Sequence, residues 1–306
     1  MGGKAYIFPG QGSQYVGMAR EFAREIPGAR AVIEQADRIL GFPLSTLCFE
    51  GPEEELRQTQ NTQPAIFLHS ILSARALQNV APAQMVAGHS LGEYSALVVA
   101  GALGFEDGLR LVRLRGELMQ RAGESQRGTM AAIVGLSAEE LTALCTEASA
   151  AGIVQPANFN SPGQTVVSGS VDGVHRAMEL ARSRGAKLVK ELVVSGAFHS
   201  PLMEEAREGL TRALEEIEIN DARIPLYANV TGEPVTRAAT IRELLIRQLT
   251  APVLWEQSVR NMIRDGATRF VELGPGKVLQ NPVKRIHPEA SLGGVDRPGD
   301  ASKEGA

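Results

Sequence analysis

Cysteine, long apolar runs and an excess of charge of one sign are all scarce in this sequence. Its 306 residues include two cysteines, Cys48 and Cys145, and 31 basic against 35 acidic side chains give a formal net charge of −4. Two isolated cysteines without metal-ligand spacing exclude a disulfide framework and a cysteine-rich metal site. Because proteins that bind nucleic acids usually carry an excess of basic side chains that neutralise phosphates, the slight acidic excess predicts that nucleic acid is not a partner.

No stretch of the chain is long and apolar enough to predict a membrane-spanning helix. The longest apolar run, residues 96–105, falls well short of the roughly 20 residues that such a helix needs. The first residues also lack the apolar core and the cleavage site of a signal peptide. With 43% hydrophobic and 22% charged residues, the composition is that of an ordinary globular protein. We therefore expect a cytoplasmic protein that does not use a membrane.

The order of apolar segments and glycine-rich turns predicts an α/β fold. Three short apolar segments, Ala5–Phe8, Gln84–Ala87 and Arg269–Leu273, each run into a turn that contains glycine. Helical patterns follow the first two turns. Strands that alternate with helices in this way predict a parallel sheet that is covered by helices on both faces.

The middle of the chain follows a different order, βαββαβ, which is typical of a ferredoxin-like subdomain. Met130–Val134 is predicted to be its first strand. Ser137 and Glu140 have the spacing of a capping box at the start of the helix that follows. Two strands, a second helix over Val171–Ser183 and a last strand complete the order.

These patterns predict a division of the chain into domains. Residues 1–127 and 196–292 form the predicted large, hydrolase-like α/β domain, and the ferredoxin-like subdomain over 128–195 is inserted between its two parts. The segment 293–306 has few apolar side chains. We therefore expect that segment to be mobile.

The sequence Gly88-His-Ser-Leu-Gly92 matches the G-x-S-x-G pattern of a serine nucleophile. The predicted strand before it and the helix after it are the setting in which a sharp turn projects the Ser90 hydroxyl above the edge of a sheet. The main-chain N–H of Leu91 would then lie where an oxyanion develops. The pattern alone is weak, because two glycines around a serine also occur in ordinary turns.

A second glycine-rich turn, Gly10-Gln-Gly12, follows the first predicted strand. The main-chain N–H of Gln11 is a candidate for the second oxyanion donor. A plain connection between a strand and a helix would have the same spacing, so both interpretations stay open.

A serine nucleophile needs a base, and His199 is the best candidate among five histidines. It follows an apolar strand pattern over Leu188–Val194 and precedes Ser200-Pro201, a pair that suits the start of a helix. His199 is therefore predicted in a loop between a strand and a helix, although a histidine that merely packs in that loop is an equal alternative. No two histidines have the spacing of metal ligands, so we expect no metal site.

Arg115 lies on the apolar stripe of a predicted helix over Glu106–Met119, between Leu111 and Leu118. A guanidinium that faces the core must find an anion, because a buried charge without a partner is costly. Its partner is either an internal carboxylate or the carboxylate of a substrate, for which arginine offers a bidentate geometry.

Together, these stretches resemble the malonyl-CoA:acyl carrier protein transacylase family of bacterial fatty acid synthesis. The segments that carry the resemblance occur in family order along nearly the whole chain. They are Phe8–Gln14, Gln60–Pro64, Gly88–Tyr94, Arg113–Gly116, Asn160–Gln164, Gly196–Ser200, Gln248–Pro252 and Glu272–Gly276.

The resemblance implies a ping-pong transfer of the malonyl group from malonyl-CoA to the phosphopantetheine thiol of acyl carrier protein. Ser90 would attack the thioester and form a malonyl-serine intermediate. His199 would act as base and then as acid, and the N–H groups of Gln11 and Leu91 would bind the oxyanion. Arg115 would bind the free carboxylate of the malonyl group.

Two further roles follow from the family. The main-chain carbonyl at the position of Gln248 orients the histidine in place of a carboxylate. Phe198 matches the malonyl-selective form of its motif, whereas methylmalonyl-selective relatives carry a small residue there. The resemblance implies no metal or redox cofactor, only coenzyme A thioesters as substrates, and we expect a monomer.

Three alternatives share parts of this pattern. A serine hydrolase or thioesterase would use the same nucleophile, base and oxyanion hole. A polyketide-synthase-associated acyltransferase would serve another pathway, and a binding module could keep the fold without the chemistry. The apolar setting of Arg115 and the lack of a distinctive acid between Ser90 and His199 favour acyl transfer over hydrolysis.

Overall fold

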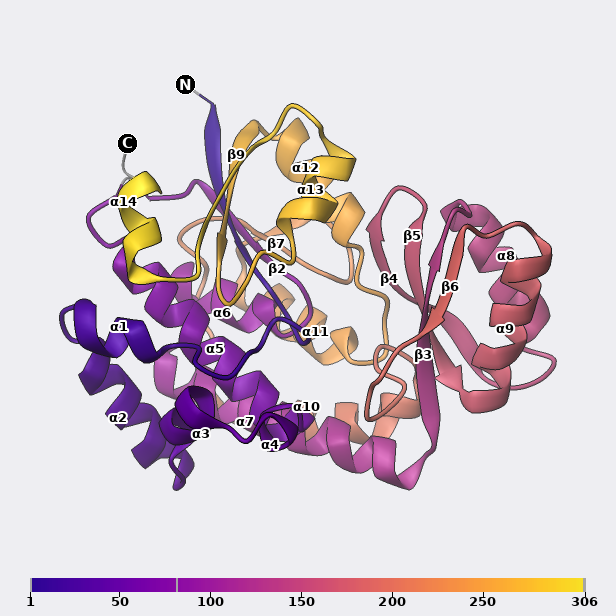
Figure 1. The fold of residues 1–306 in the computed structure, drawn as a ribbon, viewed down its shortest axis with the longest axis horizontal. Helices are drawn as coiled ribbons and strands as arrows, with labels where there is room; N and C mark the ends of the chain where they lie inside the picture. Colours follow the sequence, from indigo (N-terminus) through magenta and orange to yellow (C-terminus); the bar gives the residue numbers. More distant parts are fainter. Residues whose placement is uncertain (1, 81, 305–306) are drawn as a thin grey trace.

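The computed structural model describes residues 2–80 and 82–304, which build two β-sheets and the helices around them (Figure 1). The larger sheet consists of β1 (Gly3–Phe8), β2 (Met85–Gly88), β7 (Leu226–Tyr227), β8 (Pro234–Val235), β9 (Ala267–Leu273) and β10 (Ser291–Val295). Its strand order is β10-β9-β1-β2-β7-β8, and all neighbours are parallel except β7 and β8. This is the parallel core predicted from the strand–turn–helix pattern.

Helices cover both faces of this sheet because successive side chains of a buried strand point in opposite directions. In β1, Tyr6 and Phe8 join one core, whereas Ala5 and Ile7 join another. The first core contains α1 (Arg20–Glu25), α2 (Ala29–Leu40), α3 (Leu44–Glu50), α4 (Glu53–Leu56), α5 (Thr59–Ala76), α6 (Gly92–Val99), α7 (Phe105–Ser125), α10 (Glu204–Glu216) and α11 (Ala238–Gln248). The second core contains α12 (Trp255–Arg264) and α13 (Gln280–Ile286).

The smaller sheet is antiparallel and has its own core. It consists of β3 (Gly128–Val134), β4 (Val154–Ser161), β5 (Gln164–Ser170) and β6 (Leu188–Glu191), with α8 (Ala138–Ala148) and α9 (Val171–Ser183) packed on it. The strand order β4-β5-β3-β6 is the ferredoxin-like order, which confirms the predicted fold class. The Ser137–Glu140 capping box is present at the start of α8.

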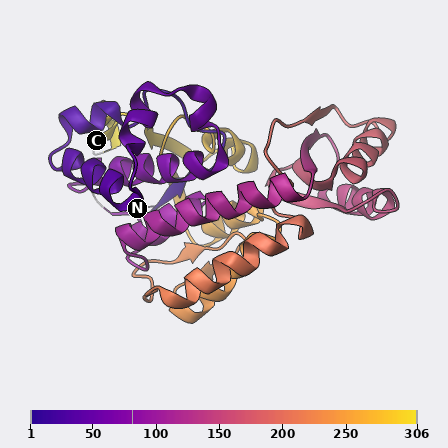
Figure 2. The same cartoon turned by 90° about the horizontal axis from the view of Figure 1, so that it is seen from below.

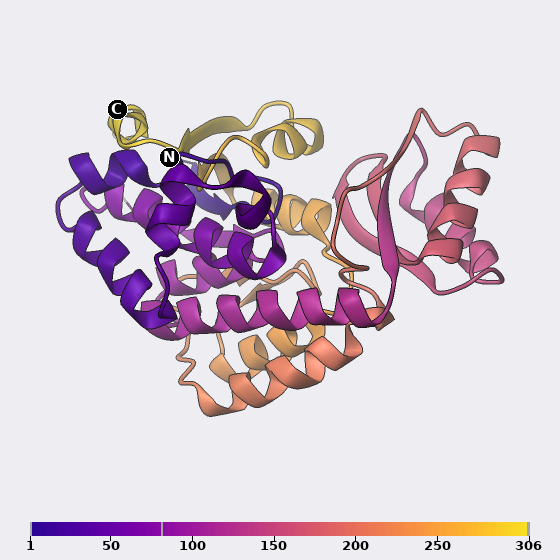
Figure 3. The same cartoon turned by 60° about the horizontal axis from the view of Figure 1, so that its bottom comes forward.

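The long helix α7 connects the two sheets (Figures 2 and 3). Its 21 residues run from below the larger sheet to the first strand of the smaller one. The chain returns to the larger part through residues 192–200, η1 (Pro201–Met203) and α10. The domain boundaries at residues 127/128 and 195/196 stay a prediction. None of the helices in residues 2–80 and 82–304 combines the length and the apolar character that crossing a membrane requires.

The segment 293–306, which the sequence predicts to be mobile, has regular structure as far as residue 304, and its mobility stays a prediction. β10 extends to Val295 and pairs with β9, and η2 (Pro298–Asp300) and α14 (Ala301–Glu304) follow. The Glu304 carboxylate accepts hydrogen bonds from the Arg269 guanidinium, at 2.8 Å, and from the main-chain N–H of Gly294, at 3.2 Å. Main-chain pairing with β9 and one partly buried ion pair, Arg269–Glu304, hold this segment although it has few apolar side chains. Residues 305–306 lie outside the described part.

Replacing Glu304 with alanine is expected to lower the free energy of unfolding by about 1–3 kcal/mol, because two partly buried donors lose their acceptor. The side chain of Glu304 is 4% exposed, whereas the neighbouring Lys303 is 74% exposed and pairs with Asp300. A Lys303→Ala variant serves as the matched control and should stay within about 0.5 kcal/mol of the parent. Urea unfolding measures both, and equal values for the two variants would contradict the anchoring role of Glu304.

Candidate active site

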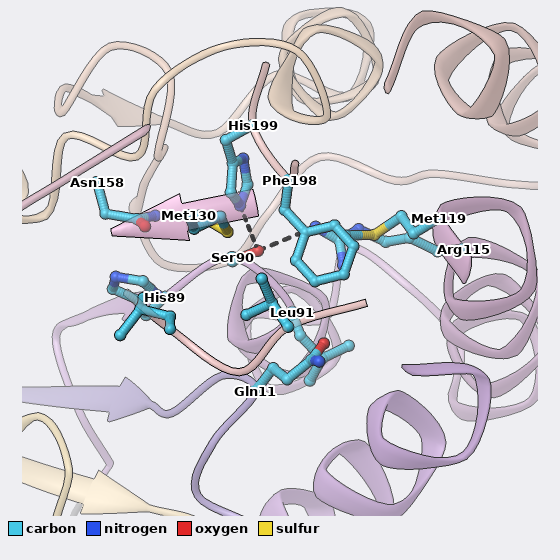
Figure 4. Close-up of a pocket in the computed structure, with 12 residues that line it drawn as sticks. Gln11, His89, Ser90, Leu91, Arg115, Met119, Met130, Asn158, Phe198 and His199 are labelled. Atoms are coloured by element: carbon cyan, nitrogen blue, oxygen red, sulfur yellow. Dashed lines mark hydrogen bonds between the residues drawn. The ribbon is translucent and has the colours of Figure 1, made fainter. Parts of the chain in front are cut away.

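A cavity of about 140 Å³ lies between the two parts of the molecule and brings together the side chains that the motifs indicated (Figure 4). Both parts of the molecule and the segment that follows β6 contribute to its lining. The lining residues are Gln11, His89, Ser90, Leu91, Arg115, Met119, Met130, Asn158, Leu192, Val194, Phe198 and His199.

Ser90 occupies the sharp turn between β2 and α6. Its φ of 51° is left-handed, which is rare for a residue other than glycine. A Cβ atom on Gly88 would lie 1.9 Å from the carbonyl carbon of Gly92, so only glycine permits this close approach. The strained turn is held by Asn229, whose Oδ1 accepts a hydrogen bond from the main-chain N–H of Ser90 at 2.7 Å. The predicted elbow is therefore present.

His199 lies 3% exposed in the loop before η1, and its φ of 56° is also left-handed. Its Nε2 is 2.8 Å from Ser90 Oγ, and its Nδ1 is 2.8 Å from the main-chain oxygen of Gln248. A carbonyl oxygen can only accept, so Nδ1 carries the proton of the neutral ring. Nε2 is then free to accept the proton of the Ser90 hydroxyl.

Burial, followed by the positive charge of Arg115, lowers the pKa of His199 to about 3. Burial also lowers the pKa of His89, whose Nε2 lies 2.9 Å from Asn160 Oδ1. The imidazole beside Ser90 is therefore neutral at physiological pH, which is the state in which it can take up a proton.

The His199 ring is expected to stay neutral between pH 8 and pH 5, because its lowered pKa lies below that range. Two-dimensional NMR of histidine-labelled protein measures this, and a His199→Asn variant assigns the signal. Ring shifts that stay constant over this range agree with the expectation. A titration midpoint near the ordinary histidine value of about 6.5 would contradict it.

Arg115 is 1% exposed in the middle of α7 and points into the cavity. Its Nη1 donates to Gln63 Oε1 at 2.9 Å, and its Nη2 donates to Ser90 Oγ at 3.0 Å and to Gln248 Oε1 at 2.9 Å. Within residues 2–80 and 82–304, no Asp or Glu oxygen lies within ion-pair distance of the guanidinium. The alternative of a direct internal salt bridge is therefore wrong, and neutral groups hold the charge.

The two candidate oxyanion donors and Phe198 also border the cavity. Figure 4 places Gln11 and Leu91 on the same side of Ser90. Their main-chain N–H groups have no hydrogen-bond partner in the described part of the chain. The Phe198 ring is 6% exposed and lies beside Ser90 and Arg115.

Sequence reasoning missed three side chains that hold the site together. Gln63 and Glu93 lie inside segments that carry the family resemblance, but neither was singled out. Asn229 lies in none of those segments, and the available signal was a polar residue two positions after the apolar strand β7. Asn229 spans the turn through its amide, which donates to the main-chain oxygen of Gly88 at 2.6 Å.

Comparison with known proteins agrees with this geometry. Residues 5–295 match the acyl transferase domain family. The chain is 46% identical over 286 residues to malonyl CoA-acyl carrier protein transacylase of Bacillus subtilis, covering 92% of this chain and 90% of that protein.

Two solved structures have the same fold. The malonyl CoA-acyl carrier protein transacylase of Coxiella burnetii has a TM-score of 0.96 at 38% identity, over 99% of this chain and 97% of that one. A malonyl-transacylase in complex with its holo type II polyketide synthase acyl carrier protein has a TM-score of 0.95 at 39% identity, over 99% of both chains. The chain therefore belongs to the acyl transferase family of these transacylases, and the resemblance inferred from its motifs is confirmed.

Proposed function

We propose how the residues of the cavity carry out the reaction of this enzyme. The enzyme transfers the malonyl group from malonyl-CoA to acyl carrier protein by a ping-pong mechanism. The observation that supports the residue assignment is the position of Ser90 Oγ, 2.8 Å from a neutral imidazole and 3.0 Å from a buried guanidinium. Nucleophile, base and anion receptor thus meet at one atom.

In the first half-reaction, Ser90 Oγ attacks the thioester carbonyl while His199 Nε2 takes up the hydroxyl proton. The negative charge on the carbonyl oxygen is stabilised by the free main-chain N–H groups of Gln11 and Leu91. Collapse of the tetrahedral intermediate breaks the carbon–sulfur bond. The proton on His199 then goes to the leaving coenzyme A thiolate, and malonyl-Ser90 remains.

The second half-reaction uses the same groups in the opposite sense. His199 takes the proton of the phosphopantetheine thiol, whose sulfur attacks the malonyl-serine ester. The main-chain oxygen of Gln248 fixes the ring tautomer throughout and stabilises the imidazolium that forms in each half-reaction. Collapse releases Ser90, which regains its proton from His199.

Selectivity for malonyl rests on Arg115. Its Nε has no hydrogen-bond partner in the described part of the chain, and its bond to Ser90 Oγ becomes available once the serine is acylated. These donors suit a carboxylate. Phe198 limits the space beside the acyl group, although the exclusion of one methyl group contributes only about 1–3 kcal/mol.

The residue assignment needs no metal or redox cofactor, since side chains and main-chain amides supply every step, with coenzyme A thioesters as substrates only. We further propose that the enzyme acts as a monomer, without nucleic acid or a membrane; the formal net charge of −4 supports the absence of nucleic acid. The cytoplasmic location stays a prediction.

A transfer assay tests the proposed function. The purified enzyme is mixed with malonyl-CoA, and intact mass is recorded before and after addition of holo-acyl carrier protein. We expect malonyl-enzyme that loses its acyl group slowly to water and rapidly to the carrier. Rapid release of free malonate without transfer to the carrier would instead indicate a hydrolase or thioesterase.

A further inference from the structure

A buried glutamate lies next to the reacting groups, and the mechanism above does not use it. Glu93 is 1% exposed in the first turn of α6, three residues after Ser90. No Lys, Arg or His nitrogen in residues 2–80 and 82–304 forms an ion pair with it. Burial raises the pKa of Glu93 to about 7, while its hydrogen bond to Gln248 is the first of the effects that oppose this rise. A carboxyl group that is buried at this cost requires a specific partner.

The side-chain hydrogen-bond partner of Glu93 is the amide of Gln248, and the main-chain N–H of Asn229 and the charge of Arg115 also lower the pKa of the carboxyl group. The Nε2 of Gln248 donates one hydrogen bond to Glu93 Oε2 and another, at 3.1 Å, to the main-chain oxygen of Ser90. Its Oε1 accepts from Arg115 Nη2 at 2.9 Å. One amide therefore connects the glutamate, the elbow and the guanidinium.

The orientation of this amide is fixed by what its neighbours can offer. The main-chain oxygen of Ser90 only accepts, and the Glu93 carboxylate only accepts while it is ionised. Arg115 only donates. If the amide were reversed, its NH₂ group would face the guanidinium and its oxygen would face two acceptors. Glu93 and the Ser90 carbonyl thus select the orientation in which Gln248 presents an oxygen to Arg115.

We propose that Glu93 is a positioning residue for malonyl recognition: it orients the Gln248 amide, which in turn holds the Arg115 guanidinium where it meets the malonyl carboxylate. The inference rests on the proposed function of Arg115. It distinguishes two roles of Gln248, because the main-chain oxygen orients the base and the side chain orients the anion receptor. Only the second role depends on Glu93.

The test compares malonyl-CoA with acetyl-CoA, which lacks the carboxylate. A Glu93→Leu variant removes the acceptor, and we expect the KM for malonylation of Ser90 to rise by about tenfold or more. Acetylation of Ser90 should change by less than about threefold, because nucleophile, base and oxyanion donors are retained. Intact mass at a series of substrate concentrations gives both rates.

A double-mutant cycle tests whether the effect passes through Gln248. A Gln248→Met variant removes the amide but keeps the main-chain oxygen, and it should show the same malonyl-specific rise in KM. In the double variant, Glu93→Leu should add less than about twofold to Gln248→Met. Full additivity would mean that Glu93 acts by another route, and it would overturn the inference.

Thermal unfolding of each variant shows whether it folds. If Glu93→Leu does not fold, Glu93→Gln is used, since it keeps the shape and offers one acceptor in place of two. We then expect the ratio of malonyl to acetyl specificity to fall by at least about threefold. An unchanged ratio, or equal losses for the two substrates, would overturn the inference.

Failure of the inference can be told apart from failure of the proposed function. If the parent enzyme is malonylated and the Glu93 variant has an unchanged KM for malonyl-CoA, only the positioning role of Glu93 is rejected. A parent enzyme that is never malonylated at Ser90 rejects both.

Discussion

Replacing Ser90 with alanine is expected to lower malonyl transfer by at least about 10⁴-fold, because the covalent intermediate can no longer form. The Ser90 hydroxyl is the only group placed 2.8 Å from the His199 Nε2 in the described structure. Intact mass after mixing with malonyl-CoA should show an acylated parent enzyme and an unmodified variant. The rate of transfer to holo-acyl carrier protein quantifies the loss.

A matched control for this variant lies five residues further along the chain. Ser95 is on α6, which follows the Ser90 turn, and is fully buried, but its hydroxyl has no hydrogen-bond partner in residues 2–80 and 82–304. Ser95→Ala should therefore retain the parent rate. A Ser90→Ala enzyme with undiminished transfer would show that the acyl group is carried elsewhere, and it would revive the interpretation of the cavity as a binding module.

Removing Arg115 is expected to affect malonyl far more than acetyl transfer. We expect Arg115→Ala to lower kcat/KM for malonyl-CoA by about 10²–10³-fold, since the proposed bidentate ion pair with the malonyl carboxylate is lost. Acetyl-CoA supplies no anion, so its kcat/KM should change by less than about fivefold. The ratio of kcat/KM for malonyl-CoA to kcat/KM for acetyl-CoA is measured on one preparation of each variant. Inactive protein lowers both values equally, so it does not change this ratio.

Two further variants sharpen this test. Arg115→Lys keeps the charge but not the planar, two-pronged geometry, and it should give an intermediate ratio. Arg110→Ala changes an arginine on the same helix whose side chain is 56% exposed, and it should behave as the parent. Arg115→Ala also leaves the amide oxygens of Gln63 and Gln248 without their donor, so thermal unfolding must accompany the kinetics. Equal losses for malonyl and acetyl would mean that Arg115 is structural.

Much of the fold was readable from local patterns. The three apolar segments that end in glycine-rich turns correspond to β1, β2 and β9. A strand that is buried on both faces consists mainly of apolar residues, and the sharp turn after it requires glycine, so both features can be recognised in the sequence. The end of the chain was not readable in this way. β10 is an edge strand held by main-chain pairing with β9 and by Glu304, and neither interaction changes the local composition.

The residues of the candidate site also differ in whether a local sequence pattern indicated them. Ser90 and His199 each had a local signal in the strand or helix beside them, and Arg115 had one in its place on an apolar stripe. Asn229 holds the Ser90 turn across 139 positions of sequence, and no local pattern encodes such a contact. Glu93 was inside a recognised motif, but its role depends on Gln248, which packing brings to it from 155 positions away.

The left-handed backbone at Ser90 and His199 has a consequence for protein engineering. Such a conformation costs a residue other than glycine about 1–2 kcal/mol, while glycine would lose about 0.5–1 kcal/mol through the greater freedom of its unfolded chain. Counted on backbone strain alone, glycine would be favoured at both positions, although it would discard nucleophile and base together with the hydrogen bonds that they make. Thermostable versions of this enzyme should be sought with the two codons held fixed and with turnover screened alongside melting temperature.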